Sequence, residues 1–561
     1  MLSPVCLTCR RRRIQCDGAR PCSPCTARGL QCAGGYNATL SARGRPGDVP
    51  AGTANAQGDR TEVGTPTRMK AVHGSIRSSI TRDPKPSLYR EAQAIFDGLR
   101  YFNERISSDL ISIDSHFNPY RVDLARIAAM PRLYVMLVVT SANVHLAMQN
   151  EANLGRPLEI VQREQDTFGF RMRVLSGLNN RLGKRETQAS DATLMCLMCL
   201  LITTMQQSPY TEWRVHLEGL RKIIQMRGGM KMTLNKSPSF KPYLVAFMIV
   251  DVMAAITTHS AHKHMAEATL MALNYWAVEP NIFQSNLAIS APCPEDLFQC
   301  LILVNYLRST TEKAKLESRR KAGTRMVLTK IRHFDVKVWA NKMQGFKGWK
   351  ATKDGVEFDA VPKQPSTEKA DETGEPERTL HTPESMEITQ KSSPLSEDHT
   401  NPKSPKTSET DLWLSVATNY QAAVLLYAIR TLIIDVPEDK DFLYEEEPSL
   451  DIAALRMETR ETLINSLSAI FPDIKQVQQI GKLVLFPVFM CGMEIRHDEN
   501  ELQDFIVNGL LMLGQSLGTF GPICAIDELK FKWAADAAAP EGRHVTWNEY
   551  FQTRPDFIFG F

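Results

Sequence analysis

The sequence has no long run of apolar residues. A helix needs roughly 20 consecutive apolar residues to cross a bilayer, and the most apolar stretches, 133–140, 194–202 and 243–256, are shorter. The last of them also contains Asp251. The first residues have no apolar core of the kind that a secretion signal requires. We therefore expect a soluble chain with no membrane partner.

The residue patterns on which most enzymes depend are also missing. We find no paired carboxylates, no nucleophile beside a base, and no glycine-rich phosphate loop that opens a helix after a strand. Gly228 and Gly229 instead follow a helical pattern, where a glycine pair is a natural helix stop. We predict that the protein is not an enzyme.

Cysteine is scarce outside one short segment. Six of the twelve cysteines lie between residues 6 and 32, and the others are scattered over the rest of the chain. This distribution argues against an exported disulfide scaffold and favours a reducing compartment with metal thiolates. Cys196 and Cys199 form a second C-x2-C pair, but they lie on an apolar helical stretch without further ligands nearby. We interpret that pair as buried packing.

The short segment reads CLTCRRRRIQCDGARPCSPCTARGLQC, with the spacing C-x2-C-x6-C-x5-C-x2-C-x6-C. Thiolates are strong ligands for Zn²⁺, and a two-residue gap lets both sulfurs of a pair reach one tetrahedral ion. Six thiolates can give two ions four ligands each only if two of them bridge. Because so short a segment cannot fold alone, metal must supply on the order of 10 kcal/mol of folding free energy per structural zinc. The predicted ligands are Cys6, Cys9, Cys16, Cys22, Cys25 and Cys32.

Four consecutive arginines, Arg10, Arg11, Arg12 and Arg13, follow the second cysteine. Guanidinium groups neutralise phosphates and can read guanine O6 and N7 in the major groove. The run also has the composition of a nuclear import signal, which is compatible with DNA binding. Residues 1–85 carry 14 Lys and Arg against 5 Asp and Glu, a net charge of +9, so the rest of this +3 chain carries −6. A basic head on an acidic body is typical of a nucleic-acid binder with a separate regulatory part.

This segment resembles the fungal binuclear zinc-cluster (Zn2Cys6) DNA-binding domain, including the basic run and Pro21 before the fourth cysteine. The resemblance implies two Zn²⁺ ions bridged by Cys6 and Cys22. It implies one zinc held by Cys6, Cys9, Cys16 and Cys22, and the other by Cys6, Cys22, Cys25 and Cys32.

The resemblance also implies which residues read DNA. The family's base-reading positions, usually lysines that recognise a CGG triplet, fall on Arg12 and Arg13 in this sequence. Gln15 stands where the family often has a basic phosphate contact. Both are departures that predict an altered preference or a weaker affinity, because an arginine fork reaches differently from an ammonium.

The remaining chain is expected to be all-α. Trp213, His216 and Gly219 form a W-x2-H-x2-G pattern that, with the following Arg-Gly-Gly and the segment 486–494, is similar to the fungal-specific transcription factor regulatory domain. Composition places polar, core-poor segments between the helical parts. The expected organisation is 1–35 zinc cluster, 36–85 flexible basic linker, 86–349 helical regulatory domain, 350–410 disordered insertion, and 411–561 the second helical part.

Apolar periodicity predicts individual helices. A seam from Leu88 to Ile106 is interpreted as the first helix of the body, with a dimer coiled coil as the alternative. Ser190-Asp191 is expected to cap a core helix over 192–205, and a face from Trp413 to Tyr427 to be buried. Further helices are expected over 452–470, 476–493 and near 502–520. The aromatic tail, 544–561, is expected to dock onto the body, with an exposed partner-binding tail as the alternative.

These observations predict a zinc-dependent, sequence-specific transcription factor of RNA polymerase II genes, located in the nucleus. It would read CGG-type half-sites in double-stranded DNA and regulate a metabolic or secondary-metabolite biosynthetic gene cluster. Its other expected partners are the transcription machinery or a co-regulator, and a second copy of the chain as a homodimer. The alternative is a ligand-sensing regulator whose helical body binds a small molecule in a drug or lipid response. Thr382, Ser393 and Ser404 each precede proline and are candidate phosphorylation sites.

Overall fold

The computed structural model divides the chain into two compact units, a smaller one over Met1–Thr81 and a larger one over Arg82–Phe561. In the smaller unit, the described residues are 23–27, which include the short helix α2 (Ser23–Thr26). In the larger unit, the structure describes 86–112, 114, 118–149, 167–207, 212–273, 275, 293–310, 316–344, 349–352, 355–358, 409–436, 451–472, 477, 480–540, 545–554 and 557–558.

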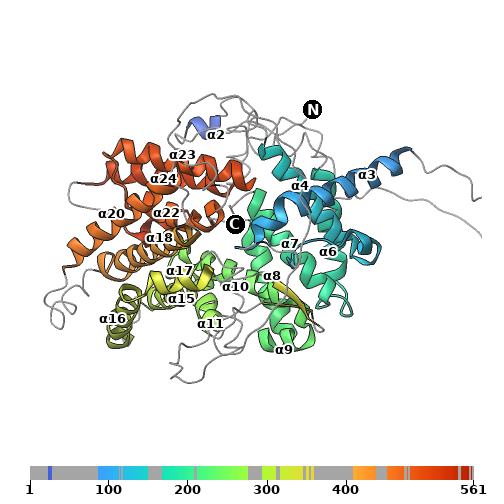
Figure 1. Cartoon of the computed structure of the whole chain (residues 1–561), viewed down its shortest axis with the longest axis horizontal. Helices are drawn as coiled ribbons and strands as arrows, with labels where there is room; N and C mark the ends of the chain where they lie inside the picture. The colour runs from blue at the N-terminus through green and yellow to red at the C-terminus, as the bar shows by residue number, and fades with distance from the viewer. Residues whose placement is uncertain are drawn as a thin grey trace, which may run out of the picture. The chain divides into compact units, whose positions relative to one another are not determined.

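The described part of the larger unit is built from helices, which confirms the predicted all-α class (Figure 1). Its α-helices are α3 (Pro86–Tyr101), α4 (Arg132–Gln149), α6 (Thr167–Leu182), α7 (Asp191–Gln207), α8 (Glu212–Met226), α9 (Gly229–Lys236), α10 (Lys241–Ile256), α11 (Lys263–Leu273), α15 (Glu295–Arg308), α16 (Glu317–Arg332), α17 (Val336–Gln344), α18 (Glu409–Ile429), α20 (Ile452–Ile470), α22 (Leu485–Glu494), α23 (Asn500–Leu517), α24 (Gly521–Ala538) and α25 (Trp547–Thr553).

Shorter helical segments and one hairpin complete the described elements. The 3-10 and π segments are η2 (Phe102–Ile106), η3 (Ser107–Leu110), η4 (Leu124–Ala129), η6 (Pro238–Phe240), η9 (Arg430–Ile434) and η11 (Gly481–Leu483). The strands β1 (Trp349–Thr352) and β2 (Gly355–Phe358) pair antiparallel, with Trp349 opposite Phe358. The sequence did not predict this hairpin, which lies at the start of the expected insertion. Residues 359–408 of that insertion lie outside the described residues.

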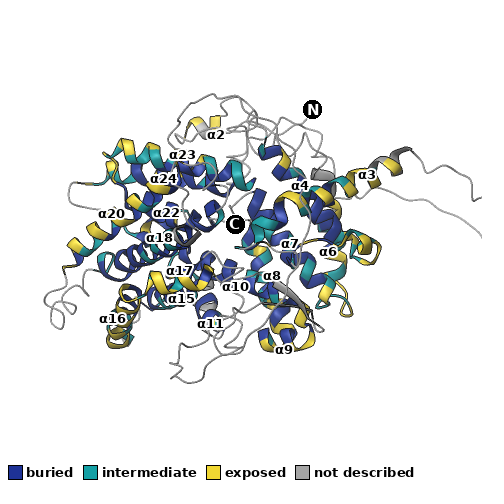
Figure 2. Ribbon diagram, in the orientation of Figure 1, coloured by how far each residue is buried: buried dark blue, intermediate teal, exposed yellow. Residues whose placement is uncertain are grey.

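Helix α18 lies at the centre of the second half of the larger unit. It contacts α15, α16, α17, α20 and α22, and it continues into the π-helix η9. Its predicted apolar face, from Trp413 through Val416, Tyr420 and Val424 to Tyr427, is buried along its whole length, which confirms the prediction. Figure 2 shows α18 mostly in the colour of buried residues, whereas the outer faces of α16 and α20 are exposed. The helix is buried all round because apolar side chains occur on every side of it.

The first half of the larger unit is organised around α4, which contacts α3, α6 and α7. Leu99, Phe102 and Ile106 of the predicted seam are buried there, whereas Ala92 near the start of α3 is exposed. The second half of the seam thus packs as part of the body, as the sequence predicted. The coiled-coil alternative for its exposed start stays a prediction.

Several helix ends lie where local chemistry placed them. The backbone N–H of Thr193 donates to Ser190 Oγ at 3.3 Å at the start of α7, which confirms the predicted cap. Helix α8 ends at Met226, and Gly228 and Gly229 follow with φ of 92° and 90°, which confirms the helix stop. Helix α20 has the predicted bounds, and the Asp451 carboxylate accepts from the N–H groups of Ala453 and Ala454.

The predicted helix over 476–493 was wrong. The chain forms η11 at 481–483, and α22 begins only at Leu485. A Cβ atom on Gly481 would lie 2.7 Å from Leu513 Cδ2 of α23, so the bare backbone at this break lets α23 approach closely. Helix α23 itself ends at Leu517, three residues earlier than the predicted 520, and Gly518 caps it with φ of 58°.

The aromatic tail docks onto the core, as the sequence predicted. Trp547, Tyr550, Phe551 and Phe557 are all buried. Trp547 Nε1 donates to the carbonyl oxygen of Ile256 at 2.8 Å, and Thr257 Oγ1 donates to the carbonyl oxygen of Phe557 at 2.5 Å. The final helix thereby covers the end of α10.

In the part of the chain that the structure describes, two helical segments are long and apolar enough to cross a membrane, Pro238–Ile256 and Leu412–Ile434. The first is longer than the sequence suggested, because η6 continues directly into α10. In both, 78% of the apolar window is buried inside the protein. Asp251 in α10 is buried and forms an ion pair with Arg221. Both segments therefore serve as core helices here.

Candidate metal centre and cavities

The predicted zinc ligands fall almost entirely outside the described residues. Of the six predicted ligands, the structure describes the backbone of Cys25. This residue lies in α2, which begins directly after Cys22. The N–H of Ala27 donates to the carbonyl oxygen of Ser23 at 2.9 Å and extends this turn. The other five cysteines and Arg10 to Arg13 lie outside the described residues.

The donor set fits zinc by its chemistry. Six thiols within 27 residues can supply two tetrahedral thiolate sites with two shared sulfurs. Sites filled by four thiolates have no open position for a substrate, so the zinc ions would have a structural role. Their contribution would be folding free energy for the smaller unit.

The cysteines of the larger unit behave differently. Burial raises the pKa of the Cys196 thiol to about 11 and that of Cys199 to about 12. Such thiols stay protonated and are poor metal ligands. Within the described ranges, no three His, Cys, Asp or Glu side chains come together in a way that could hold a metal ion. The interpretation of Cys196 and Cys199 as packing residues is confirmed.

Buried ions in the larger unit hold helices together. Glu494 accepts from Arg456 at 2.6 Å and lies 3.6 Å from Arg430. Arg430 also donates to the carbonyl oxygen of Val545 at 2.7 Å, and Asp435 accepts from the N–H of Trp547 at 2.6 Å. This network joins η9, α20 and α22 to the docked tail. Its charges are paired with opposite charges, which is the pattern of a structural ion cluster, although Arg430 Nε and Glu494 Oε1 make no hydrogen bond.

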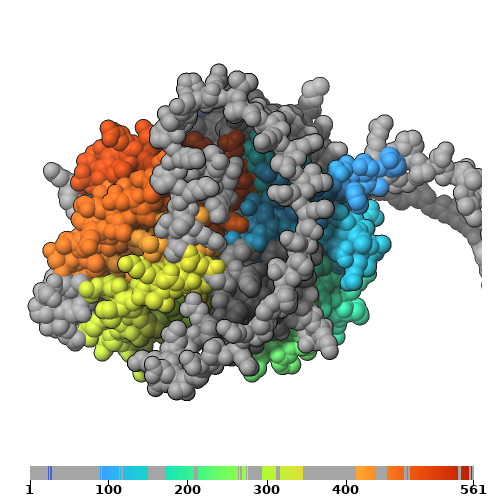
Figure 3. Space-filling model, in the orientation of Figure 1, coloured from blue at the N-terminus to red at the C-terminus, as the bar shows by residue number. Residues whose placement is uncertain are grey.

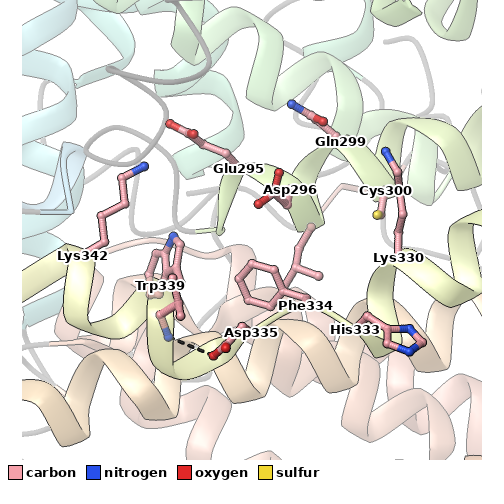
Figure 4. A pocket seen from close by; sticks show the side chains of 12 residues that line it. Glu295, Asp296, Gln299, Cys300, Lys330, His333, Phe334, Asp335, Trp339 and Lys342 are labelled. Atoms are coloured by element: carbon pink, nitrogen blue, oxygen red, sulfur yellow. Dashed lines mark hydrogen bonds between the residues drawn. The ribbon is translucent and has the colours of Figure 1, made fainter.

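A cavity of about 420 Å³ lies between the start of α15, the end of α16 and α17. We call it the polar cavity, and its charged and aromatic lining includes Glu295, Asp296, Lys330, Asp335, Trp339 and Lys342 (Figure 4). Burial raises the pKa of the Glu295 carboxyl to about 7, although the nearby charge of Lys342 acts to lower it. The Asp335 carboxylate accepts from the N–H groups of Lys337 and Val338 at 3.0 and 2.9 Å and so caps α17.

A second cavity, of about 480 Å³, lies between α6, α7 and α8. We call it the apolar groove, since its lining includes Leu178, Leu197, Leu200 and Ile223. His216 lines it from α8 and is half-buried. No carboxylate lines this groove among the described residues.

The sequence missed the polar cavity. Its residues come from three separate segments, 295–300, 330–335 and 338–342, and none forms a motif by itself. The available signal was an acidic pair at a helix start, Glu295-Asp296 after Pro294, and that pattern is common to many helices.

Comparison with known proteins agrees with the sequence. Residues 4–39 match the fungal Zn(2)-Cys(6) binuclear cluster domain, and residues 98–560 match the fungal specific transcription factor domain. The chain is 21% identical over 553 residues, 94% of its length and 86% of the relative's, to the phomenoic acid biosynthesis cluster-specific transcriptional regulator of Leptosphaeria maculans. No solved structure matches the chain.

These matches confirm the resemblance drawn from the cysteine spacing and from the helical motifs. The matched cluster domain binds two zinc ions. Both matched domains and the relative are those of transcription regulators, so the protein is a DNA-binding regulator and not an enzyme. The chain belongs to the family of fungal Zn2Cys6 transcription factors, in which a binuclear zinc cluster is joined to a helical fungal-specific transcription factor domain.

Proposed function

We propose that the protein binds CGG-type half-sites through Arg12 and Arg13, with Arg10 and Arg11 on phosphates. The observation that carries this proposal is the arginine run between the second and third cysteines of the matched cluster domain. Arginine reads guanine O6 and N7 in a bidentate manner, and each such contact discriminates by about 1 to 3 kcal/mol.

The proposed zinc ligands are Cys6, Cys9, Cys16, Cys22, Cys25 and Cys32, with Cys6 and Cys22 shared by both ions. We expect two zinc ions per chain in the purified protein and fewer in a Cys25→Ser variant. Cys199→Ser is the matched control, because Cys199 is half-buried in the core of the larger unit and should leave zinc content unchanged. A wild-type content of one zinc would contradict the binuclear assignment.

The target genes are proposed to be RNA polymerase II genes of a metabolic or secondary-metabolite biosynthetic cluster, regulated in the nucleus. The support is the relative's description as a cluster-specific regulator. Transcription machinery or a co-regulator would contact the larger unit. A homodimer would place two clusters on paired half-sites, whose spacing then follows dimer geometry.

Genome-wide occupancy of the tagged protein tests both parts of this proposal. Peaks that share a CGG-like element and vanish in an Arg12→Ala, Arg13→Ala double variant would establish direct readout. The genes beneath those peaks would identify the pathway. Peaks that persist in the double variant would show that other residues select the sites.

A second candidate function is ligand sensing by the larger unit. Its specific support is the pair of cavities of about 420 and 480 Å³, a size that holds small molecules in other proteins. A sensor of this kind would couple occupancy of a cavity to the activity of the DNA-bound protein.

A further inference from the structure

The polar cavity has a lining that is both charged and aromatic. Three carboxylates, two ammonium groups and two aromatic rings surround it, and they come from α15, α16, α17 and the turn between the last two. Figure 4 shows Glu295 and Lys342 on one side of the cavity and Lys330 on the other. The segment coloured yellow in Figure 3, which includes α16, lies on the visible face of the molecule, and several α16 side chains are exposed. Every residue that lines it is described, so its chemistry can be argued from side chains.

Glu295 is the residue that points to a ligand. Its Oε1 atom is buried and accepts no hydrogen bond in the protein. A buried carboxylate oxygen without a donor costs free energy that a suitable ligand would recover. The neighbouring carboxylate of Asp335 already has hydrogen-bond donors, because its Oδ1 accepts from two backbone N–H groups at the start of α17. Asp296 is exposed at the rim.

The charges of the lining favour a cation. Asp296 and Asp335 add negative charge beside Glu295, and the two lysines are divided between α16 and α17. The other lining side chains of a titrating type are Cys300 and His333. Burial raises the pKa of the Cys300 thiol to about 12, and His333 Nδ1 lies 2.9 Å from the carbonyl oxygen of Thr329. A ligand ammonium could donate to Glu295 without displacing any hydrogen bond that this carboxylate oxygen makes.

The aromatic rings add a second requirement. Phe334 and Trp339 line the cavity, and aromatic faces attract organic ammonium groups and pack against apolar substituents. Trp339 in turn meets Trp413 of α18 edge-on, with ring centroids 5.9 Å apart. An occupant of the cavity would therefore contact a side chain that packs on the central helix of the larger unit.

We propose that the polar cavity binds a small organic ammonium compound, whose charged nitrogen donates to Glu295 and whose apolar part packs against Trp339. The site adds a chemical class to the ligand-sensing candidate, and its occupancy does not depend on which DNA sequence the zinc cluster reads. A failure of one proposal is therefore distinguishable from a failure of the other.

Benzylammonium is a probe that carries both required features. We expect it to bind the purified full-length protein in isothermal titration calorimetry, whereas neutral benzyl alcohol should bind at least tenfold more weakly. Glu295→Gln keeps the size of the side chain and removes the charge, and it should weaken benzylammonium about tenfold or more, as loss of a charge-assisted hydrogen bond does. Glu317→Gln on exposed α16 is the matched control and should leave the affinity unchanged.

Two further measurements separate binding at Glu295 from general attraction to an acidic surface. Lys342→Gln removes the cation whose charge acts on Glu295, so at pH 8 it should tighten benzylammonium binding. In the wild type the affinity should rise about tenfold between pH 6 and pH 8, because a carboxyl with a pKa of about 7 is mostly neutral at the lower pH. Histidines titrate in the same range, so the rise must disappear in Glu295→Gln to be assigned to Glu295.

Equal binding of benzyl alcohol and benzylammonium would overturn the proposal. So would an unchanged affinity in Glu295→Gln, or the absence of any binding at millimolar probe. DNA binding by the same protein samples, measured separately, reports only on the zinc cluster.

Discussion

Replacement of Trp547 by alanine tests how strongly the C-terminal segment holds the larger unit together. The indole is about 1% exposed. Its ring centroid lies 5.2 Å from that of Tyr427 and 5.1 Å from that of Phe551. Removal of a buried tryptophan typically costs about 3 to 5 kcal/mol, through lost burial and the cavity that remains. We expect Trp547→Ala to destabilise the full-length protein by that amount.

Trp547→Phe separates packing from hydrogen bonding. The indole N–H donates to the carbonyl oxygen of Ile256, but Arg308 Nη1 donates to the same oxygen at 3.1 Å. The acceptor therefore keeps a partner when the N–H is lost, and the remaining ring fills part of the space. We expect Trp547→Phe to cost about 1 to 2 kcal/mol, since a hydrogen bond contributes about 1 kcal/mol net.

The assay is urea unfolding followed by the helical circular dichroism signal, with both variants compared to the wild type. If Trp547→Ala lowers the free energy of unfolding by less than about 1 kcal/mol, the reasoning is refuted, because removal of a fully buried indole should destabilise the protein by more than that. Equal losses for the alanine and phenylalanine variants would show that the N–H, and not the packing, carries the effect.

Three other predictions concern buried positions of the larger unit. Gly518→Ala should lower the melting temperature, because the new Cβ would overlap the His145 ring and φ is 58°; Gly183→Ala, where the nearest atom would be 3.5 Å away, should leave it nearly unchanged. Burial lowers the pKa of His145 to about 4, so as pH falls the imidazole is protonated in the unfolded state before it is protonated in the folded state. The free energy of unfolding should therefore fall by about 3 kcal/mol between pH 6.5 and pH 4. In denaturant titrations, His145→Gln should abolish this part of the pH dependence. Asp251→Ala removes the partner of Arg221 and Tyr275 and should lower the free energy of unfolding by about 3 to 5 kcal/mol. If Tyr275→Phe lowers it by less than half of that amount, most of the effect belongs to the ion pair with Arg221.

The sequence predicted those parts of the structure that short-range chemistry determines. Metal-ligand spacing is a local property, so six cysteines were enough to identify the zinc cluster domain that the comparisons confirm. The helix stop at Gly228 and the cap at Ser190 also depend on a few neighbouring atoms. The buried face of α18 followed from apolar side chains at three- and four-residue steps.

The features that the sequence did not predict depend on distant partners. The break at Gly481 depends on Leu513 of α23, whose side chain packs where a Cβ atom on residue 481 would lie. Arg308 is buried and donates to the carbonyl oxygens of Ala255, Ile256 and Thr258 at the end of α10. Glu295, Lys330 and Lys342 meet at the polar cavity only after three segments have packed. Neither the periodicity nor the spacing of residues in the sequence predicts such contacts between distant segments.

The docking of the tail onto α10 sets an order of events during protein synthesis. Trp547 caps a carbonyl that lies 291 residues earlier in the chain, and ribosomes add about 5 to 20 residues per second. Trp547 is therefore synthesised on the order of tens of seconds after α10, whereas the zinc cluster needs only the first residues of the chain and metal. The part that recognises DNA can be finished well before the part that regulates it. A stop codon shortly before Trp547 would leave the cysteines of the zinc cluster in the chain, but the carbonyl oxygen of Ile256 would lose its bond from Trp547.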